Sequence, residues 1–91
     1  MRIRGFEWDA GSAGHIEEKH GVTPGEVEEV FRGGPLLRRG RKGRMTALGR
    51  TTAGRYLFVV YVWRPGGKVR VITARDMTLA ERRYYRRQGG R

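Results

Sequence analysis

The segment RYLFVVYVW at residues 55–63 is followed by RPGG at residues 64–67 and by KVRVITAR at residues 68–75. The first segment has apolar side chains on both of its alternating faces, so we expect a strand in the middle of a sheet that is covered on both sides. The glycine pair predicts a tight turn, after which the third segment returns as the neighbouring strand. A hairpin therefore lies at the centre of the predicted fold.

Two helices are predicted before this hairpin. Asp9 or Ser12 can cap a helix that runs to about His20, since each side chain can accept a hydrogen bond from a free backbone N–H. Residues 23–26, TPGE, combine a capping box with a proline at the first helical position. The glycines and the proline at residues 33–35 end this second helix.

A further helix follows the hairpin, and shorter strands complete the sheet. Residues 78–81 form another capping box, and we expect Leu79 and Tyr84 of the helix that it opens to face inward. Weaker strand candidates are residues 2–8, 36–37 and 45–48. The predicted order is β-α-α-β-β-β-α, an α+β fold with a small antiparallel sheet and segregated helices. Its length predicts a single domain, residues 1–91, in which residues 88–91 are a frayed tail.

The chain is strongly basic, and its charge is unevenly distributed. Twenty Lys and Arg residues, seventeen of them Arg, stand against nine Asp and Glu, and the net charge is +11. Residues 1–31 have a net charge of −4, whereas residues 32–91 have a net charge of +15. A GC-rich genome explains part of the preference for arginine but not so high a net charge. Such a field attracts polyanions, and arginine both matches phosphate and stacks on bases.

The residue inventory excludes several kinds of chemistry. There is no Cys and Ser12 is the only Ser, so catalysis by a Ser or Cys nucleophile is excluded. His15 and His20 are five residues apart, which places them on different faces of a helix rather than in a metal-binding pair. The glycines match neither a P-loop nor a dinucleotide fingerprint. No apolar run is long enough for a signal peptide or a membrane span, so we expect a cytoplasmic protein without membrane contact, metal or other cofactor.

The remaining basic and aromatic residues suit cleavage of RNA without a metal ion. In that reaction a general base takes the proton of the 2′-hydroxyl, cations stabilise the charge on the phosphoryl group, and a general acid protonates the leaving 5′-oxygen. His20 is a candidate acid or base, and Arg75, at the end of an apolar strand, is a candidate cation. This hypothesis requires that His20 and Arg75 share one electropositive hollow.

Each candidate also has a purely structural interpretation. Lys19 and His20 can simply complement the dipole at the end of a helix, and Arg75 can be a solvated or ion-paired side chain. Counting in steps of two places Arg70 on the opposite face of its strand from Arg75. The turn at residues 38–44, RRGRKGR, either binds phosphate groups or only increases the solubility of the protein.

A set of short motifs extends from Phe6 to Tyr85. The motifs are FEWD (6–9), KHGV (19–22), VF (30–31), GRT (49–51), GRYL (54–57), VRVITAR (69–75) and a final helix with Glu81 and YY (84–85). In this order and spacing they resemble the BrnT-type toxins of type II toxin–antitoxin systems.

This resemblance implies a compact RelE-like fold, metal-independent cleavage of RNA, including ribosome-associated mRNA, and neutralisation by a BrnA-type ribbon-helix-helix antitoxin. It also implies that operator DNA is bound only by the toxin–antitoxin complex. By position, the catalytic residues of the family, with Glu7 nearby, fall on Lys19, His20, Arg50, Arg70 and Arg75. RNA contacts are expected from Trp8, Arg38, Arg39, Arg41, Lys42, Arg44 and Arg55.

One segment departs from the family pattern. After the second helix, family members have a longer segment rich in Asp, Glu, His and Ser, whereas residues 36–45 are the short, basic LLRRGRKGRM. If an acidic residue of that segment acts as a base, His20 or Glu7 has to replace it here. The alternative is a non-catalytic RNA- or ribosome-binding protein on the same scaffold. A third interpretation is a structural or regulatory protein whose basic face meets an acidic partner.

Overall fold

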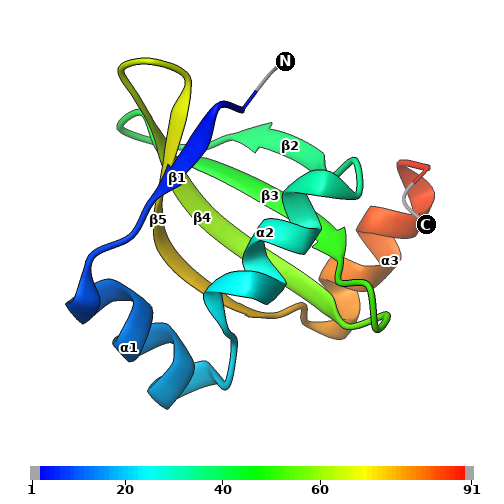
Figure 1. Cartoon of the computed structure of the whole chain (residues 1–91). Helices are drawn as coiled ribbons and strands as arrows, with labels where there is room; N and C mark the ends of the chain where they lie inside the picture. Colours follow the sequence, from blue (N-terminus) through cyan, green and yellow to red (C-terminus); the bar gives the residue numbers. More distant parts are fainter. Residues whose placement is uncertain (1–2, 90–91) are drawn as a thin grey trace.

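The computed structural model describes residues 3–89, which form one five-stranded sheet and three helices (Figure 1). The strands are β1 (Gly5–Glu7), β2 (Leu36–Arg39), β3 (Met45–Arg50), β4 (Tyr56–Arg64) and β5 (Lys68–Asp76). The helices are α1 (Ala10–His20), α2 (Pro24–Arg32) and α3 (Leu79–Arg87). The predicted α+β class is confirmed. The predicted order has one strand too few, because both weaker candidates, residues 36–37 and 45–48, form strands, β2 and β3, on either side of the basic turn.

The strand order is β1-β5-β4-β3-β2, so the apolar β4 lies in the middle of the sheet, as predicted. The pairs β5–β4, β4–β3 and β3–β2 are antiparallel, as expected for strands joined by short turns. In contrast, β1 pairs in parallel with β5. The sheet is therefore mixed rather than antiparallel. Two helices separate β1 from β2, so no short turn ties the first strand to its neighbour in the sequence.

The two faces of the sheet are covered differently. Helices α1 and α2 lie on one face, where Ile16, Val27 and Val30 belong to one buried cluster with Val59 and Val71 of the sheet. Helix α3 packs on the other face, at the end where β3 stops and β4 starts (Figure 1). The main core therefore lies between the sheet and the first two helices, and part of the opposite face remains accessible.

The helix ends follow the sequence signals. Asp9 caps α1, because its carboxylate accepts a hydrogen bond from the backbone N–H of Ser12. The capping boxes at residues 23–26 and 78–81 are both formed. Helix α2 ends at Arg32, immediately before the predicted glycine stop.

Helix α3 presents a different residue to the sheet than predicted. Tyr85 is buried and Tyr84 is half-buried, whereas Leu79 is 62% exposed. At 3.6 residues per turn, Leu79 lies roughly 120° around the helix from Tyr85, so the two side chains cannot both face the sheet. The prediction that Leu79 faces inward is wrong.

The register of β5 shifts at a β-bulge. The pairing of β4 with β5 changes between Val60 and Tyr61, which leaves Ile72 of β5 as an extra residue without a partner. Beyond Ile72 each side chain points to the face opposite to the one that counting in steps of two predicts. Arg70 and Arg75 therefore lie on the same face, the one against which α3 packs. The prediction that they point to opposite faces is wrong.

The remaining predictions concern the first strand, the C-terminal tail and membrane spans. Strand β1 is shorter than the predicted strand 2–8, of which Arg2 lies outside the described residues. Residues 88–89 form a turn after α3, and residues 90–91 of the predicted tail also lie outside the described residues. Within residues 3–89, no helix has the length and apolar character that a membrane span requires.

Candidate nucleic-acid interface

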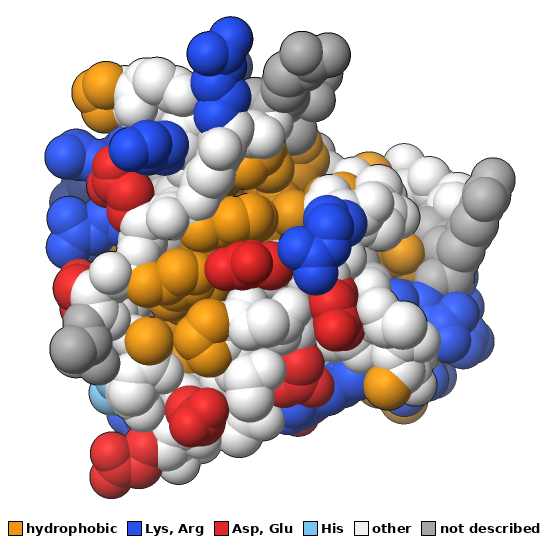
Figure 2. All heavy atoms as spheres, viewed as in Figure 1, with side chains coloured by type: hydrophobic (Ala, Val, Ile, Leu, Met, Phe, Trp, Pro, Cys, Tyr) orange, Lys and Arg blue, Asp and Glu red, His pale blue; other side chains and the backbone are white. Residues whose placement is uncertain are grey.

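The sheet face against which α3 packs is rich in arginine. The strand register and the contacts with aromatic rings place eight arginines on it, which define what we call the arginine face. These are Arg38, Arg50, Arg64, Arg70 and Arg75 from the strands and Arg82, Arg86 and Arg87 from α3. The view in Figure 2 is from the opposite side, where acidic side chains lie around α1 and α2. The two faces of the molecule thus differ in charge.

Guanidinium groups of the arginine face lie over aromatic rings. Within the described part of the chain there are six such pairs, with 4.2–6.0 Å between the guanidinium carbon and the ring centre. They join Arg38 and Arg87 to Tyr84, Arg75 to Phe58, and Arg50, Arg82 and Arg86 to Tyr56. Arginine forks and aromatic rings on one surface are the groups that bind phosphates and stack on bases in single-stranded RNA.

Tyr56 is at the centre of the densest group, which we call the tyrosine–arginine cluster: Tyr56, Arg50, Arg82 and Arg86. The guanidinium carbons of Arg82, Arg50 and Arg86 lie 4.3, 4.8 and 5.5 Å from the centre of its ring. The Tyr56 hydroxyl accepts a hydrogen bond of 3.0 Å from Nη2 of Arg86. This hydrogen bond and the charges of Arg50 and Arg86 lower the pKa of Tyr56 below its ordinary value of 10.0.

An open hollow of about 340 Å³ lies beside this cluster. It is lined by Gly54, Arg55, Tyr56, Asp76, Met77 and Arg82. Two members of the tyrosine–arginine cluster, Tyr56 and Arg82, thus reach a space that is open to a phosphate group.

Arg75 is held by an acidic partner on the arginine face. Its Nη1 and Nη2 donate hydrogen bonds of 2.8 and 2.9 Å to the two carboxylate oxygens of Glu81, and Nη1 also donates to the carbonyl of Asp76. The pairing raises the pKa of Arg75 and lowers that of Glu81. Because Glu81 belongs to the capping box of α3, Arg75 ties the start of α3 to the end of β5.

Arg55 is engaged in a network rather than free for RNA. It forms ion pairs with Asp76 and Glu26, and it donates hydrogen bonds to the carbonyls of His20 and Gly21. Its hydrogen bond to Asp76 is the main cause that raises the pKa of Arg55, and the same bond lowers the pKa of Asp76. Arg55 therefore joins the α1–α2 connection to the hairpin.

His20 and Arg75 belong to different elements. His20 is the last residue of α1, where its carbonyl accepts a hydrogen bond from Arg55, whereas Arg75 lies on the arginine face over Phe58. The charge of His20 acts instead on Asp76. It lowers the pKa of Asp76 in addition to the larger effect of Arg55. Neither His20 nor Arg75 lines the hollow beside the tyrosine–arginine cluster. The shared electropositive hollow that the sequence hypothesis requires is not formed there.

The other predicted residues are dispersed. Lys19 is exposed near the end of α1, and Trp8 is half-buried and donates a hydrogen bond from its indole N–H to Glu28. Arg70 lies at the edge of the arginine face and pairs with Asp9 at 3.2 Å. The remaining predicted RNA contacts, in or next to the β2–β3 turn, are exposed: Arg39, Arg41, Lys42 and Arg44.

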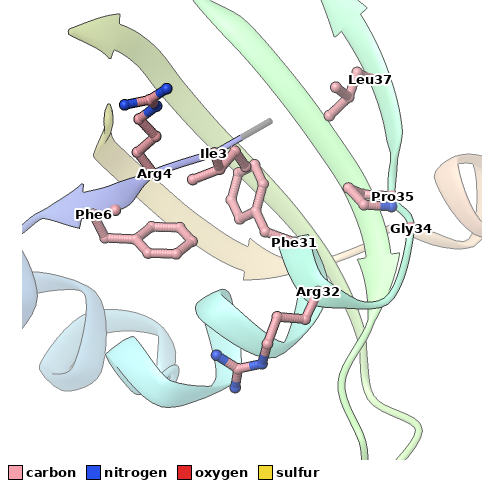
Figure 3. A pocket seen from close by; sticks show the side chains of 9 residues that line it. Ile3, Arg4, Phe6, Phe31, Arg32, Gly34, Pro35 and Leu37 are labelled. Atoms are coloured by element: carbon pink, nitrogen blue, oxygen red, sulfur yellow. The ribbon is translucent and has the colours of Figure 1, made fainter. Parts of the chain in front are cut away.

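A larger hollow of about 590 Å³ lies on the opposite face (Figure 3). Its lining side chains are mostly apolar, with Phe6 and Phe31 on one side and Leu37 on the other, and with Arg4 and Arg32 at its border. No carboxylate, imidazole or hydroxyl lines it, so it offers no group for proton transfer. Within residues 3–89, no three His, Cys, Asp or Glu side chains come together as a metal site requires.

The comparisons with known proteins agree with this architecture. Residues 8–81 match the model of a family described as the ribonuclease toxin BrnT of type II toxin–antitoxin systems. The chain belongs to this family. The fold is similar to that of the Brucella abortus ribonuclease toxin BrnT in its crystal structure, with a TM-score of 0.70 and 16% sequence identity over 85% of this chain and 99% of that one. No curated protein matches the sequence significantly.

In this BrnT-family chain, Arg50 is a residue that the sequence predicts for the site, whereas three residues around it were not predicted. Tyr56, Arg82 and Arg86 complete the tyrosine–arginine cluster. Two signals could have indicated them. Arg82 and Arg86 are four residues apart on a helix and so share one face. Tyr56 alternates with Leu57, which belongs to the main core, and therefore points to the other side of β4.

Proposed function

We propose that this ribonuclease toxin cleaves RNA on its arginine face without a metal ion, and that the scissile phosphate binds at the tyrosine–arginine cluster. The observation that supports this most is the convergence of Arg50, Arg82 and Arg86 on Tyr56, beside an open hollow. Three guanidinium groups from β3 and α3 can surround one phosphate from two elements. No other aromatic ring in the described residues has three arginines over it.

The chemistry that this arrangement favours is attack by the neighbouring 2′-oxygen. As the 2′-oxygen bonds to phosphorus and the 5′-oxygen departs, negative charge builds up on the phosphoryl oxygens. Arginine side chains that are already in place stabilise this charge with little reorganisation, which is the function a divalent metal has in other nucleases. The products are a 2′,3′-cyclic phosphate and a 5′-hydroxyl.

The proposal is tested by digesting a single-stranded RNA of mixed sequence in excess EDTA. We expect wild-type protein to cleave it, and Arg50→Gln to lower the cleavage rate by about 100-fold, the scale of losing one transition-state hydrogen-bond donor. Arg32→Gln is the matched control, because this substitution removes the same charge from the opposite face. Salt-sensitive RNA binding without cleavage would instead support the non-catalytic alternative. A wild-type activity that EDTA abolishes would contradict metal independence.

The cognate antitoxin is proposed to be a ribbon-helix-helix protein of the BrnA type that acts in the same cytoplasm. Neutralisation is proposed to occur by covering the arginine face with acidic groups, and only the toxin–antitoxin complex would bind operator DNA. The high positive charge of this face supports an acidic partner surface. Co-purification with such an antitoxin should protect the arginine face from hydrogen exchange and abolish RNA cleavage. Protection confined to the apolar hollow on the other face would contradict this arrangement.

A further inference from the structure

Tyr56 has surroundings that differ from those of the other tyrosines of the chain. Its hydroxyl accepts a hydrogen bond from Arg86, and three guanidinium groups lie over its ring. The side chain is held by packing as well, since its ring meets that of Tyr85 edge to face at 6.0 Å. Tyr56 also lines the open hollow beside the cluster.

The arginine face offers few other groups that could accept a proton. Glu81 uses both carboxylate oxygens for Arg75, and Glu7 pairs with Arg64 at 3.2 Å. His20, the base suggested by the sequence, does not line the hollow beside the cluster, although its charge acts on Asp76, which does. Among residues 3–89, Tyr56 is the titratable group that remains in contact with the three arginines.

We propose that Tyr56 is a catalytic residue of the cleavage reaction and that its phenolate oxygen takes the proton of the attacking 2′-hydroxyl; this inference rests on the proposed function. The O2′–H bond breaks as the Tyr56 O–H bond forms, and the 2′-oxygen bonds to phosphorus. The P–O5′ bond then breaks, and the 5′-oxygen takes a proton from water. Tyr56 afterwards returns its proton to water, so the step needs no oxidant, metal or co-reactant.

The electrostatic setting of Tyr56 favours the phenolate. Arg50 faces it from β3, and Arg82 and Arg86 face it from α3, while Asp76 lies across the hollow with Arg55 as its partner. The hydrogen bond from Arg86 is the largest cause that lowers the pKa of Tyr56. The same three cations that bind the phosphate therefore also prepare the base, which couples substrate binding to proton transfer.

The test is single-turnover cleavage of a short single-stranded RNA in EDTA, measured as a function of pH. Tyr56→Phe should lower the cleavage rate by about 100-fold or more, the usual contribution of a general base, while RNA affinity changes little. Tyr61→Phe is the matched control, because it removes a hydroxyl from a buried tyrosine on the other face. The wild-type rate should rise with pH with its midpoint below pH 10.0, in the direction in which the pKa of Tyr56 is lowered, and Tyr56→Phe should lack this rise.

Arg86→Gln tests whether Tyr56 acts as the base or has only a structural role. Only in the first case should the pH dependence of the cleavage rate change. Without the Arg86 hydrogen bond, the midpoint of the rate rise should shift to higher pH, toward the ordinary tyrosine value. If wild-type protein cleaves RNA and Tyr56→Phe keeps both its rate and its pH profile, Tyr56 is not the base, although the proposed function stands. If wild-type protein binds RNA but cleaves none at any pH, the proposed function fails, and this inference fails with it.

Discussion

Tyr61 brings a hydroxyl into the main core without a hydrogen-bond partner among the described residues. Its side chain is fully buried, and its ring contacts Phe31 and Trp63 edge to face at 5.1 and 5.8 Å. Burial raises the pKa of Tyr61, so the hydroxyl stays protonated and neutral. A buried polar group without a partner costs about 1–3 kcal/mol.

We therefore expect Tyr61→Phe to stabilise the protein. The ring and its aromatic contacts remain, while the unpaired hydroxyl is removed, so the free energy of unfolding should rise by about 1 kcal/mol. Urea denaturation followed by tryptophan fluorescence measures this difference. An unchanged or lower free energy of unfolding would show that the hydroxyl has a partner, such as a buried water molecule.

Gly49 allows α2 to approach β3 closely. A Cβ atom added at Gly49 would lie 2.9 Å from Cγ1 of Val30 and 3.4 Å from Cβ of Pro35. Gly49→Ala should therefore lower the free energy of unfolding by about 1–3 kcal/mol, as overpacking does in other cores. Gly5→Ala in β1 is the control, since no atom lies within 4 Å of the added Cβ. Equal melting temperatures of the two variants would show that α2 can move away from β3 without loss of stability.

At the level of elements, α3 depends on one carboxylate with two functions. Glu81 accepts a hydrogen bond from the Thr78 N–H, which completes the capping box, and it also pairs with Arg75. Glutamine keeps the capping geometry but removes the charge. Glu81→Gln should therefore lower the free energy of unfolding at pH 7 by about 1 kcal/mol or less, since the ion pair is partly exposed.

The pH dependence of this difference has a definite sign. The pKa of Glu81 is lowered in the folded state from its ordinary 4.5, so its stabilising contribution is complete above pH 4.5 and is lost as pH falls through the lower, folded value. Wild type and Glu81→Gln should differ at pH 7 and converge below pH 4.5 in thermal unfolding. Glu18→Gln is the control, because Glu18 is an exposed residue of α1, far along the chain from Arg75. A difference that persists unchanged at low pH would contradict this assignment.

The sequence was sufficient for those elements whose signals are local. The capping boxes at residues 23–26 and 78–81, the central strand and the hairpin turn all depend on neighbours in the chain, and they form as predicted. The partner of β1 and the bulge at Ile72 depend on contacts between distant segments, which no local pattern encodes. The arrangement of the predicted site residues depends on the same distant contacts, since one extra residue in β5 changes the face on which Arg75 lies.

At the scale of the whole molecule, charge is separated between two faces. The acidic residues of the N-terminal third lie mainly on and around α1 and α2 (Figure 2). On the far side of the molecule, α3 and the sheet strands beneath it provide the arginine face. A long-range field of this kind attracts RNA to the molecule as a whole, but the bound phosphates contact only one side. The effect of a charge on RNA affinity should therefore depend on its position as well as on its sign.

A pair of double variants with equal charge separates these two contributions. Arg82→Gln/Arg86→Gln removes two positive charges from the arginine face, and Arg4→Gln/Arg32→Gln removes two from the border of the apolar hollow. Each phosphate contact to a single strand adds roughly 0.7 to the slope of log affinity against log salt concentration. The first variant should lose about 1.4 units of slope, measured by fluorescence anisotropy with a labelled RNA between 50 and roughly 200 mM salt. The second should keep the wild-type slope and lose only a little affinity at low salt. Equal losses in the two variants would mean that net charge alone binds RNA, and that the arginine face is not the interface.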